Sequence, residues 1–523
     1  KIIRANKKSN QNAPALSRSN WIWLAVILSV IFIVYLPALN KEFINYDDNW
    51  YILDNPVINP FAFENIGKIF SGFYFGQYSP LPTVFLGIIQ SISGSQPFLY
   101  NLGAVVLHLA NVCLVFWLVL RLGKKPEAAL AVGALFGVCP LNVESVAWAS
   151  AAFKTGLYCG FFLLSLIAYT FYIATDNRKY IAASLVFFTL SFLSKEQAAA
   201  LPLSILCIDF LNGRKLLSKK VLLEKLPFFV LAAVFVLVTV AAVKSYNTEL
   251  IYIHYPFIQR VLYASYAFGE YFIKHFVPYE LSAHYPYPER GLLSLWFFIH
   301  PLIVAGLISL FIRTVKKNRS IAFGILFFAA NILFTLALQV VSVRLSVMAD
   351  RYVYVSSIGM FFLAVSALET FQKEKQKIIP MVVAGTFLIF FSAASYARCN
   401  AWKNSLVVWN DILSKYPKTD FAYNNRGSVY FDDKKYDSAF SDFNKAIEVN
   451  PQYSTAYNNR GNIYFERGDF IKAAEEYTKA IKINPRFALA YKNRGQAMMK
   501  EKKRGEALAD FNKAIELNVD NED

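Results

Sequence analysis

Histidine, methionine and cysteine are scarce in this chain of 523 residues, which has five of each. The cysteines lie scattered through apolar stretches and form no CxxC pair, which argues against a disulfide framework and a thiolate zinc site. They are Cys113, Cys139, Cys159, Cys207 and Cys399. The histidines show no spacing of four residues with one another, so we predict no structural metal.

Charged residues are also sparse, at 17%, whereas 56% of the residues are apolar and 16% aromatic. A soluble domain of this length needs far more polar surface. The net charge of +17 is compatible with nucleic-acid binding. However, the basic residues form short clusters between apolar stretches, which is typical of membrane orientation signals. The composition therefore indicates a polytopic membrane protein that contacts lipid and binds no nucleic acid.

The apolar stretches predict an all-α membrane bundle over residues 20–400, preceded by a basic cytoplasmic N-terminus at 1–19. A transmembrane helix needs about 20 apolar residues. We expect about eleven crossings, near 20–39, 99–121, 127–142, 157–174, 180–194, 197–211, 226–244, 292–313, 320–341, 352–371 and 378–398. The first is interpreted as a retained helix, because no small-residue cleavage site follows it.

Basic clusters indicate which ends of these helices face the cytoplasm. With eleven crossings, five clusters fall on the same side as the N-terminus. They are Arg121/Lys124/Lys125, Arg178/Lys179, Arg214/Lys215/Lys219/Lys220, Arg313/Lys316/Lys317/Arg319 and Lys373/Lys375/Lys377. Segment 257–277 would reverse the later clusters if it crossed, so we expect it to lie in the outer interface or to re-enter. The C-terminal region then lies outside the cytoplasm.

Polar residues gather in the predicted outer loops. The first of these loops, 40–98, contains Asn45-Tyr46-Asp47-Asp48-Asn49. Later outer turns contain Asn142, Glu144, Lys154, Lys195, Glu196, Arg344, Asp350 and Arg351. Because ionisable groups at the ends of apolar helices are costly unless they are paired or hydrated, we expect them to share a cavity.

Residues 401–523 contain a strict repeat of 34 residues, the tetratricopeptide pattern. Tyr423, Tyr457 and Tyr491 are equivalent, as are Gly427, Gly461 and Gly495, and Pro451 precedes Pro485 by one period. The predicted repeats are near 420–453, 454–487 and 488–521, and a half-unit, Trp402 to Pro417, precedes them. Such a solenoid binds a protein or peptide, or serves only as a packing spacer.

The motifs of the membrane half occur in a specific order. They are Asn45-Tyr46-Asp47-Asp48, then Cys139-Pro140-Leu141-Asn142-Val143-Glu144, then Ser194-Lys195-Glu196-Gln197, then Asp350-Arg351-Tyr352. With tetratricopeptide repeats behind them, they resemble the transmembrane-and-tetratricopeptide O-mannosyltransferases and their bacterial relatives, of the glycosyltransferase C superfamily. The resemblance implies transfer of a sugar from a polyprenyl-phosphate carrier to an acceptor, a protein hydroxyl, outside the cytoplasm of a bacterial inner membrane.

The resemblance also implies roles for individual residues. Asp47 and Asp48 correspond to the family's catalytic acidic pair, and the outer cations Lys154, Lys195, Arg344 and Arg351 are expected to hold the carrier phosphate. Glu144 and Glu196 are candidate substrate-binding acids. No cofactor is firmly predicted, and a divalent cation between the aspartates and phosphate is left open.

Structural readings of the same residues also stay open. The aspartates suit a helix cap or a solvated turn, and Glu144 could pair with Lys154. Lys195 and Glu196, or Asp350 and Arg351, could form simple ion pairs. The chain also departs from its relatives, which often read His-Pro-Leu-His at Cys139–Asn142 and carry an acid at Thr155. Two other functions remain: a non-catalytic membrane scaffold that binds proteins through its repeats, and an envelope polysaccharide polymerase or ligase.

Overall fold

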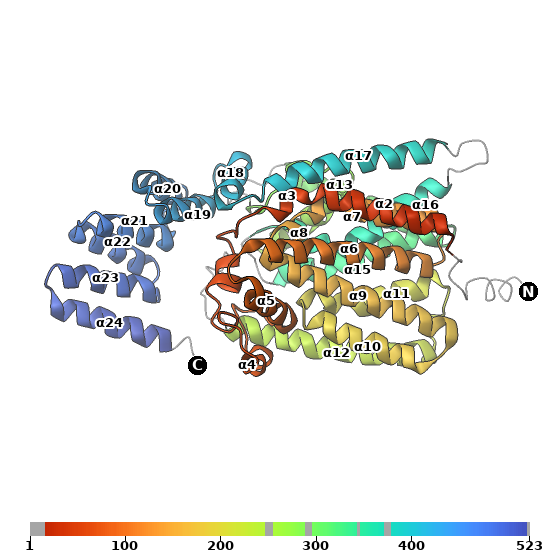
Figure 1. Cartoon of the computed structure of the whole chain (residues 1–523), viewed down its shortest axis with the longest axis horizontal. Helices are drawn as coiled ribbons and strands as arrows, with labels where there is room; N and C mark the ends of the chain where they lie inside the picture. The colour runs from red at the N-terminus through yellow and green to blue at the C-terminus, as the bar shows by residue number, and fades with distance from the viewer. Residues whose placement is uncertain (1–15, 246–254, 288–294, 342–345, 371–377, 520–523) are drawn as a thin grey trace, which may run out of the picture. The chain divides into compact units, whose positions relative to one another are not determined.

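The computed structural model describes residues 16–245, 255–287, 295–341, 346–370 and 378–519. Over these ranges the regular structure is helical, and the only β-type contacts are two isolated bridges. The chain divides into two compact units (Figure 1). The second consists mainly of the residues after Lys403, but it also takes in Ile44–Tyr46 from the first outer loop.

Long apolar helices run side by side in the first unit (Figure 1). Their bounds are α2 Arg18–Val34, α6 Pro97–Arg121, α7 Pro126–Gly137, α9 Ala149–Thr175, α10 Arg178–Phe192, α11 Leu201–Leu211, α12 Lys219–Ser245, α13 Phe257–Lys274, α14 Leu295–Thr314, α15 Arg319–Val341, α16 Ser356–Thr370 and α17 Ile378–Asn400. Short elements join them: α3 Leu36–Leu39, η1 Asn49–Leu53, α4 Asn65–Ser71, α5 Pro80–Ser93, η2 Pro140–Asn142, α8 Glu144–Ala147, η3 Glu196–Ala200 and η4 Asp350–Val353.

Each of the eleven predicted apolar segments contains one of these helices, but eleven crossings are not confirmed. Six helices in the described ranges are long and apolar enough to cross a membrane, or seven if a bent pair counts as one span. The six correspond to α6, α9, α12, α14, α15 and α17. The other five helices have fewer than 18 residues, from 11 in α11 to 17 in α2. The predicted interfacial segment 257–277 forms α13, which is outside this set of six.

Two helix breaks explain part of the shortfall. Between α7 and the η2–α8 segment the chain bends by 51°, and Pro140 stands at the break, where it cannot continue an α-helical hydrogen-bond ladder. The stretch after α10 likewise leaves the helix before Lys195, whose backbone is extended. These breaks place Glu144 and Lys195 at the ends of apolar helices, where polar side chains can meet.

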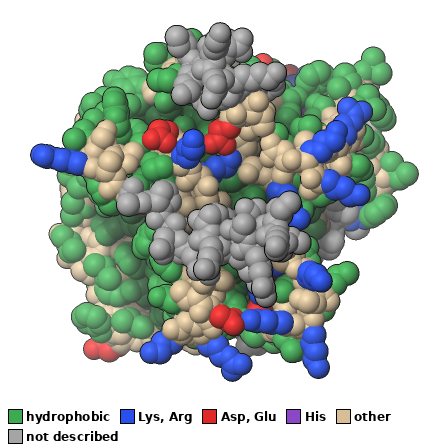
Figure 2. All heavy atoms as spheres, turned by 90° about the vertical axis from the view of Figure 1, so that its right-hand side faces the viewer, with side chains coloured by type: hydrophobic (Ala, Val, Ile, Leu, Met, Phe, Trp, Pro, Cys, Tyr) green, Lys and Arg blue, Asp and Glu red, His purple; other side chains and the backbone are tan. Residues whose placement is uncertain are grey.

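Four of the predicted basic clusters collect at one end of the first unit, and the fifth, Lys373/Lys375/Lys377, lies outside the described residues. Arg121 ends α6, Arg178 and Arg319 begin α10 and α15, and Arg313 lies in the last turn of α14. Viewed from this end, Lys and Arg side chains spread over the surface with few acids (Figure 2). An α-helix rises about 1.5 Å per residue, so the 27 residues of α9 extend about 40 Å, enough to separate Lys154 near its start from this basic end.

A buried ion network ties α9, α11 and α12 together at the basic end. The Arg214 guanidinium lies 2.8 Å from Asp209 Oδ1 and 2.6 Å from Glu224 Oε2, and Lys225 also pairs with Asp209. Tyr172 donates to Glu224 at 2.7 Å. Because each acid has a cationic partner, charges that would be costly in an apolar bundle are compensated.

The second unit is a helical hairpin solenoid. Its helices are α18 Ser405–Lys415, α19 Asp420–Asp432, α20 Tyr436–Val449, α21 Ser454–Glu466, α22 Phe470–Ile483, α23 Ala488–Lys500 and α24 Arg504–Val519. The repeated glycine lets paired helices approach closely: a Cβ atom on Gly461 would lie 2.6 Å from the Tyr477 ring. The period-34 pattern therefore corresponds to a physical seam that only a small residue fits.

We expect Arg214→Ala to destabilise the first unit by about 3 kcal/mol, because it removes one cation from the buried carboxylates of Asp209 and Glu224. Lys220→Ala is the matched control, since Lys220 and Asp176 form an exposed pair. Thermal unfolding in detergent, followed by size-exclusion fluorescence, compares the two. Equal midpoints for both variants would contradict a stabilising role of the network.

Candidate active site

The first outer loop folds into a compact element with its own core. Tyr51 and Ile52 of η1 pack with Ile69 of α4 and Leu86 of α5, and the same cluster includes Phe153 of α9. The loop is therefore fixed against the helix that carries Lys154.

Asp48 caps the start of α9 and not η1, the helix that directly follows it in the chain. It precedes η1 without making a side-chain bond to it. Its carboxylate instead accepts the backbone N–H of Ser150 at 2.9 Å, in the first turn of α9. The first N–H groups of a helix have no partner within the helix, and a carboxylate there also interacts favourably with the helix dipole. Asp48 is almost fully buried, so this bond serves a clear structural purpose.

Asp47 is placed differently. Its backbone carbonyl accepts from Tyr51 N at 3.0 Å, whereas its carboxylate has no hydrogen-bond partner within the described ranges. Burial raises the pKa of Asp47, and the charges of Lys154 and Arg351 oppose this shift. A partly buried carboxylate whose pKa is raised by burial is suited to accept a proton.

Lys154 projects from the first turns of α9 towards the first outer loop. Its Nζ donates to Gln77 Oε1 at 2.9 Å and lies 3.2 Å from the centre of the Tyr51 ring. Asp47 and Glu196 interact with it electrostatically. None of the described carboxylates is within ion-pair distance of Lys154, so the predicted alternative of a Glu144–Lys154 pair is wrong.

Lys195 is held by Thr155, a residue at which this chain departs from the family that it resembles. Its Nζ donates to Thr155 Oγ1 at 3.0 Å. Burial lowers the pKa of Lys195 to about 7, Glu196 opposes this shift, and the cations Arg351 and Lys154 reinforce it. Lys195 and Glu196 therefore influence each other without forming a close ion pair in the part of the chain that is described.

Arg351 is bound by Glu144, a residue 207 positions earlier in the chain. One Glu144 oxygen pairs with the guanidinium, and the other accepts the Arg351 backbone N–H at 3.1 Å. The guanidinium carbon lies 5.1 Å from the Trp148 ring centre, and Trp148 stacks on Trp402 at 5.5 Å. Glu144 thus orients Arg351 while about a fifth of the Arg351 side chain remains exposed.

Asp350 does not pair with its neighbour Arg351 in this structure. Tyr285 Oη donates to Asp350 Oδ1 at 2.7 Å. Burial and the charge of Glu144 raise the pKa of Asp350 to about 7. A local Asp350–Arg351 pair, one of the alternatives for these residues, is therefore not formed.

The structure brings most of the predicted site residues together, and we call them the polar cluster: Asp47, Asp48, Glu144, Lys154, Lys195, Glu196 and Arg351. Arg344, the remaining predicted phosphate ligand, lies outside the described residues. Among the described residues, no three His, Cys, Asp or Glu side chains form a metal-binding group.

Sequence reasoning missed several neutral residues of the site. Gln77 and Tyr51 contact Lys154, Thr155 holds Lys195, and Trp148 lies beside Arg351. Gln77, Tyr51 and Trp148 are uncharged, and each lies far in sequence from the cation that it contacts, so no spacing in the sequence predicted these contacts. Thr155 stood out in the sequence as a departure from the pattern of the family. Its contact with Lys195 could not be predicted from the sequence.

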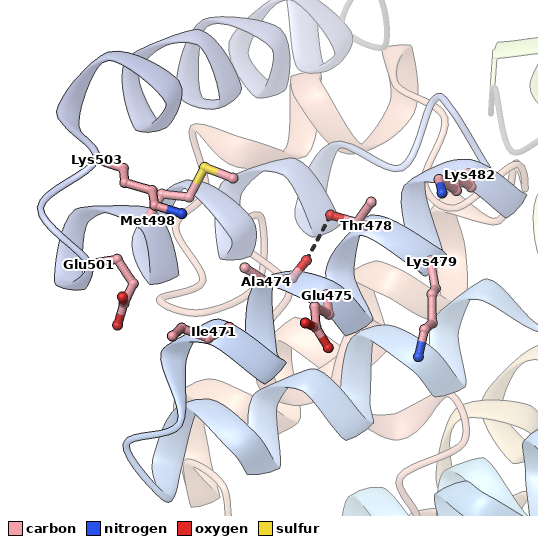
Figure 3. A pocket seen from close by; sticks show the side chains of 9 residues that line it. All are labelled: Ile471, Ala474, Glu475, Thr478, Lys479, Lys482, Met498, Glu501 and Lys503. Carbon is pink, nitrogen blue, oxygen red and sulfur yellow. Dashed lines mark hydrogen bonds between the residues drawn. The ribbon is translucent and has the colours of Figure 1, made fainter.

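A groove of about 440 Å³ lies within the second unit (Figure 3). It is formed by α22 and the end of α23, and its lining carries both charges. The lining residues are Ile471, Ala474, Glu475, Thr478, Lys479, Lys482, Met498, Glu501 and Lys503. Thr478 donates to the Ala474 carbonyl at 2.8 Å, so its hydroxyl supports α22.

Family comparisons cover both halves of the chain. Residues 77–246 match the model of the dolichyl-phosphate-mannose-protein mannosyltransferases. Residues 421–453, 443–475 and 461–502 match tetratricopeptide-repeat models. The mannosyltransferase match includes Lys154, Lys195 and Glu144.

Three relatives are described as protein O-mannosyl-transferases. F38B6.6 of Caenorhabditis elegans is 24% identical over 461 residues, covering 82% of this chain and 62% of that protein. Tmtc1 of Drosophila melanogaster is 33% identical over 141 residues, covering 25% and 16%. TMTC1 of Homo sapiens is 27% identical over 156 residues, covering 28% and 17%. The chain thus spans less than two thirds of each relative's length.

Solved structures match about a third of the chain. Crystal structures of MamA have 22–24% identity and TM-scores of 0.20–0.21, over 30–31% of this chain and 82–88% of those chains. Because these TM-scores are low, the comparison rests on the sequence matches. They confirm the resemblance inferred from the motifs: this chain combines a mannosyltransferase-type membrane domain with tetratricopeptide repeats, as the transmembrane-and-tetratricopeptide O-mannosyltransferases do.

Proposed function

We propose that this protein is an integral-membrane glycosyltransferase. It moves a sugar, with mannose the first candidate, from a polyprenyl-phosphate carrier to an acceptor hydroxyl, on a protein, at the non-cytoplasmic end of the first unit. The observation that carries the proposal is the placement of Asp47: a partly buried carboxylate without a hydrogen-bond partner among the described residues, beside Lys154 and Arg351. The matches to mannosyltransferases support the same activity.

The proposed reaction replaces one bond at the anomeric carbon of the sugar. The acceptor oxygen forms a bond to that carbon while the bond from the carbon to the phosphate oxygen breaks. The acceptor proton passes to Asp47, and polyprenyl phosphate leaves with the bonding electron pair. A base positioned for such a transfer accelerates a reaction by about 10²–10⁴-fold.

The three cations of the polar cluster suit the departing phosphate. Lys154 and Lys195 are largely buried and are held by neutral partners, Gln77 and Thr155, so their charges are not neutralised by direct ion pairs in the described part of the site. Arg351 is oriented by Glu144. Preorganised cations in a dry site stabilise developing negative charge without having to reorganise during the reaction.

The two aspartates have different proposed roles. Asp48 is committed to the first turn of α9 through Ser150 N, so we assign it to positioning. Asp47 is the proposed base. Glu196 interacts electrostatically with both Lys154 and Lys195, and we propose that it tunes these cations and lies close to the substrate.

The repeats are the proposed site of acceptor recruitment. The groove between α22 and α23 has apolar lining at Ile471 and Met498 beside charged groups of both signs. A peptide that offers apolar side chains flanked by charges would match this lining.

A transfer assay in proteoliposomes tests the assignment directly. With radiolabelled polyprenyl-phosphate mannose and a hydroxyl-bearing acceptor protein, Asp47→Asn should lose at least about 100-fold in rate, because the amide cannot take the proton. Asp48→Asn should lose much less, about tenfold, since its side-chain oxygen still caps α9. Parallel reactions with Mg²⁺, Mn²⁺ or EDTA measure the contribution of a divalent cation.

The matched control is Asp176→Asn, an exposed aspartate just after the far end of α9, which should transfer at the parental rate. Parental transfer by Asp47→Asn would show that this residue is not the base. If neither the parent nor any variant transfers sugar, and if phenotypes depend only on the repeats, the result would favour a non-catalytic scaffold.

The pH dependence of kcat/KM should be bell-shaped. Activity should rise as Asp47 loses its proton, at a pH above the ordinary range for aspartate, and fall as Lys195 loses its proton near pH 7. Lys195→Arg should move the alkaline limb up by more than about one pH unit, because a guanidinium stays charged. An alkaline limb that does not move in an active Lys195→Arg enzyme would exclude Lys195 as its cause.

Donor binding tests Lys195 without turnover. The phosphodiester of the donor keeps one negative charge between pH 6 and 8, so a change in its affinity reports on the protein. The parent should bind the donor more weakly at pH 8 than at pH 6, and Lys195→Gln should show little difference between the two.

A further inference from the structure

Some buried oxygen atoms beside the polar cluster have no hydrogen-bond partner. In the described ranges they include Ser145 Oγ, Ser150 Oγ and Gln197 Oε1, in residues of the first unit that are 3%, 1% and 4% exposed. Ser150 donates its N–H to Asp48, and Gln197 directly follows Glu196 in the chain. A buried polar atom that stays unpaired is costly, so native proteins keep such atoms mainly where a ligand or a water completes the bonding.

The amide of Gln197 is held at its nitrogen. Nε2 donates to Thr335 Oγ1 of α15 at 3.1 Å and to the Tyr352 backbone carbonyl of η4 at 3.5 Å. Because a carbonyl oxygen can only accept, the contact with Tyr352 determines which end of the amide is the nitrogen. Oε1 is then an acceptor in a fixed position, with no partner of its own in this part of the described chain.

Gln197 lies next to the cations that we assign to the carrier phosphate. Lys195 stands two residues before it, and Tyr352, whose carbonyl it binds, directly follows Arg351. Lys195 and Arg351 also influence each other electrostatically. The unpaired amide oxygen is therefore close to the groups that would surround the phosphate diester of the donor.

The chemistry of the proposed donor decides which group can satisfy this oxygen. The phosphate carries two substituents, the polyprenyl chain and the sugar. The polyprenyl chain is apolar and has no hydrogen-bond donor, whereas the sugar has several hydroxyl groups. The acceptor hydroxyl has a single proton, which the proposed reaction gives to Asp47. A sugar hydroxyl is therefore the group that matches a buried amide oxygen beside the phosphate site.

We propose that Gln197 is a specificity-determining residue of the transferase, whose Oε1 accepts a hydrogen bond from a ring hydroxyl of the donor sugar. Thr335 and Tyr352 orient the amide for this contact. The inference rests on the proposed function and adds to it the recognition of the sugar. A site built to bind a hydroxyl discriminates strongly against an analogue that lacks it, because its own polar group is then left unpaired.

Equilibrium binding to the full-length protein in detergent tests the contact. One ligand is polyprenyl-phosphate mannose, and the other is the methyl diester of the same polyprenyl phosphate, which keeps the single negative charge and lacks the sugar. Gln197→Met keeps the length of the side chain and removes the amide. It should weaken binding of the mannose donor about tenfold, the loss of one hydrogen bond to a buried group, and leave binding of the methyl diester within about twofold.

Donors that each lack one sugar hydroxyl identify the bond. For the parent, one of these deoxy donors should bind about tenfold more weakly than the complete donor. For Gln197→Met, the same deoxy donor should bind as well as the complete donor, because the bond is already missing. Such non-additivity is expected only for groups that contact each other. Additive losses for every deoxy donor would overturn the proposal.

Asn331→Leu is the matched control, since it removes a buried amide that is bonded at both ends. Asn331 lies on α15, one turn before Thr335. Its Nδ2 donates to Ser204 Oγ at 2.9 Å and to the Phe327 carbonyl at 2.8 Å, and its Oδ1 accepts from Ser204 Oγ at 3.1 Å. It should change the affinity for both ligands by the same factor. A loss confined to the mannose donor, as large as that of Gln197→Met, would mean a general packing effect and would overturn the proposal.

Gln197→Asn covers the case in which Gln197→Met does not fold. It keeps an amide and withdraws the oxygen by one methylene group, so it should lose at least about threefold in affinity for the mannose donor alone. If the parent binds both ligands and the variants lose affinity for neither, or for both alike, the sugar contact is overturned while recognition of the carrier stands. If the parent binds neither ligand, the proposed function fails, and this inference fails with it.

Discussion

The hydrogen bond from Ser150 N to Asp48 is the constraint on which the site depends. The first turn of α9 is buried, and its N–H groups would otherwise lack partners, at a cost of about 1–3 kcal/mol for each unsatisfied group. Lys41 makes a second tie at the same place, because its Nζ donates to the Ala147 carbonyl at 2.6 Å, just before α9 begins. These two bonds join the first outer loop to the start of the helix that carries Lys154 and Thr155. They thereby hold Asp48 close to the start of the helix that carries Lys154.

The electrostatics of the cluster are unusual for an apolar bundle. At the opposite end, Arg214 and Lys225 neutralise buried acids directly, as stability requires. In the polar cluster, Lys154 and Lys195 bond to neutral oxygens of Gln77 and Thr155. Holding a buried cation with a neutral partner costs stability, which is expected where binding an anionic ligand compensates for it. The two ends of the bundle thus hold their charges differently: the buried acids at one end have direct cationic partners, whereas Lys154 and Lys195 at the other end bond to neutral oxygens.

The sequence was sufficient for features that depend on local pattern. Apolar length predicted a helix in each of the eleven segments, and the spacing of Tyr457, Gly461 and Pro485 predicted the repeats, since a seam of fixed geometry needs a small residue at a fixed position. The number of crossings could not be predicted from apolar content, because the chain bends near Pro140, inside the segment 127–142 that was predicted as one crossing. Pairings between distant residues were also out of reach. Glu144 binds Arg351, 207 residues away, and Asn45 binds Trp409, 364 residues away, and only the folded chain brings them together.

We propose that the polar cluster and the basic helix ends face opposite sides of the membrane. Labelling of single-cysteine variants in intact cells with a membrane-impermeant maleimide measures this most directly. Phe63, in the first outer loop, and Leu217, among the basic residues between α11 and α12, are 84% and 88% exposed. We predict that Phe63→Cys is labelled in intact cells and that Leu217→Cys is labelled only after the membrane is permeabilised. Labelling of Leu217→Cys from outside, with protection of Phe63→Cys, would contradict this proposal.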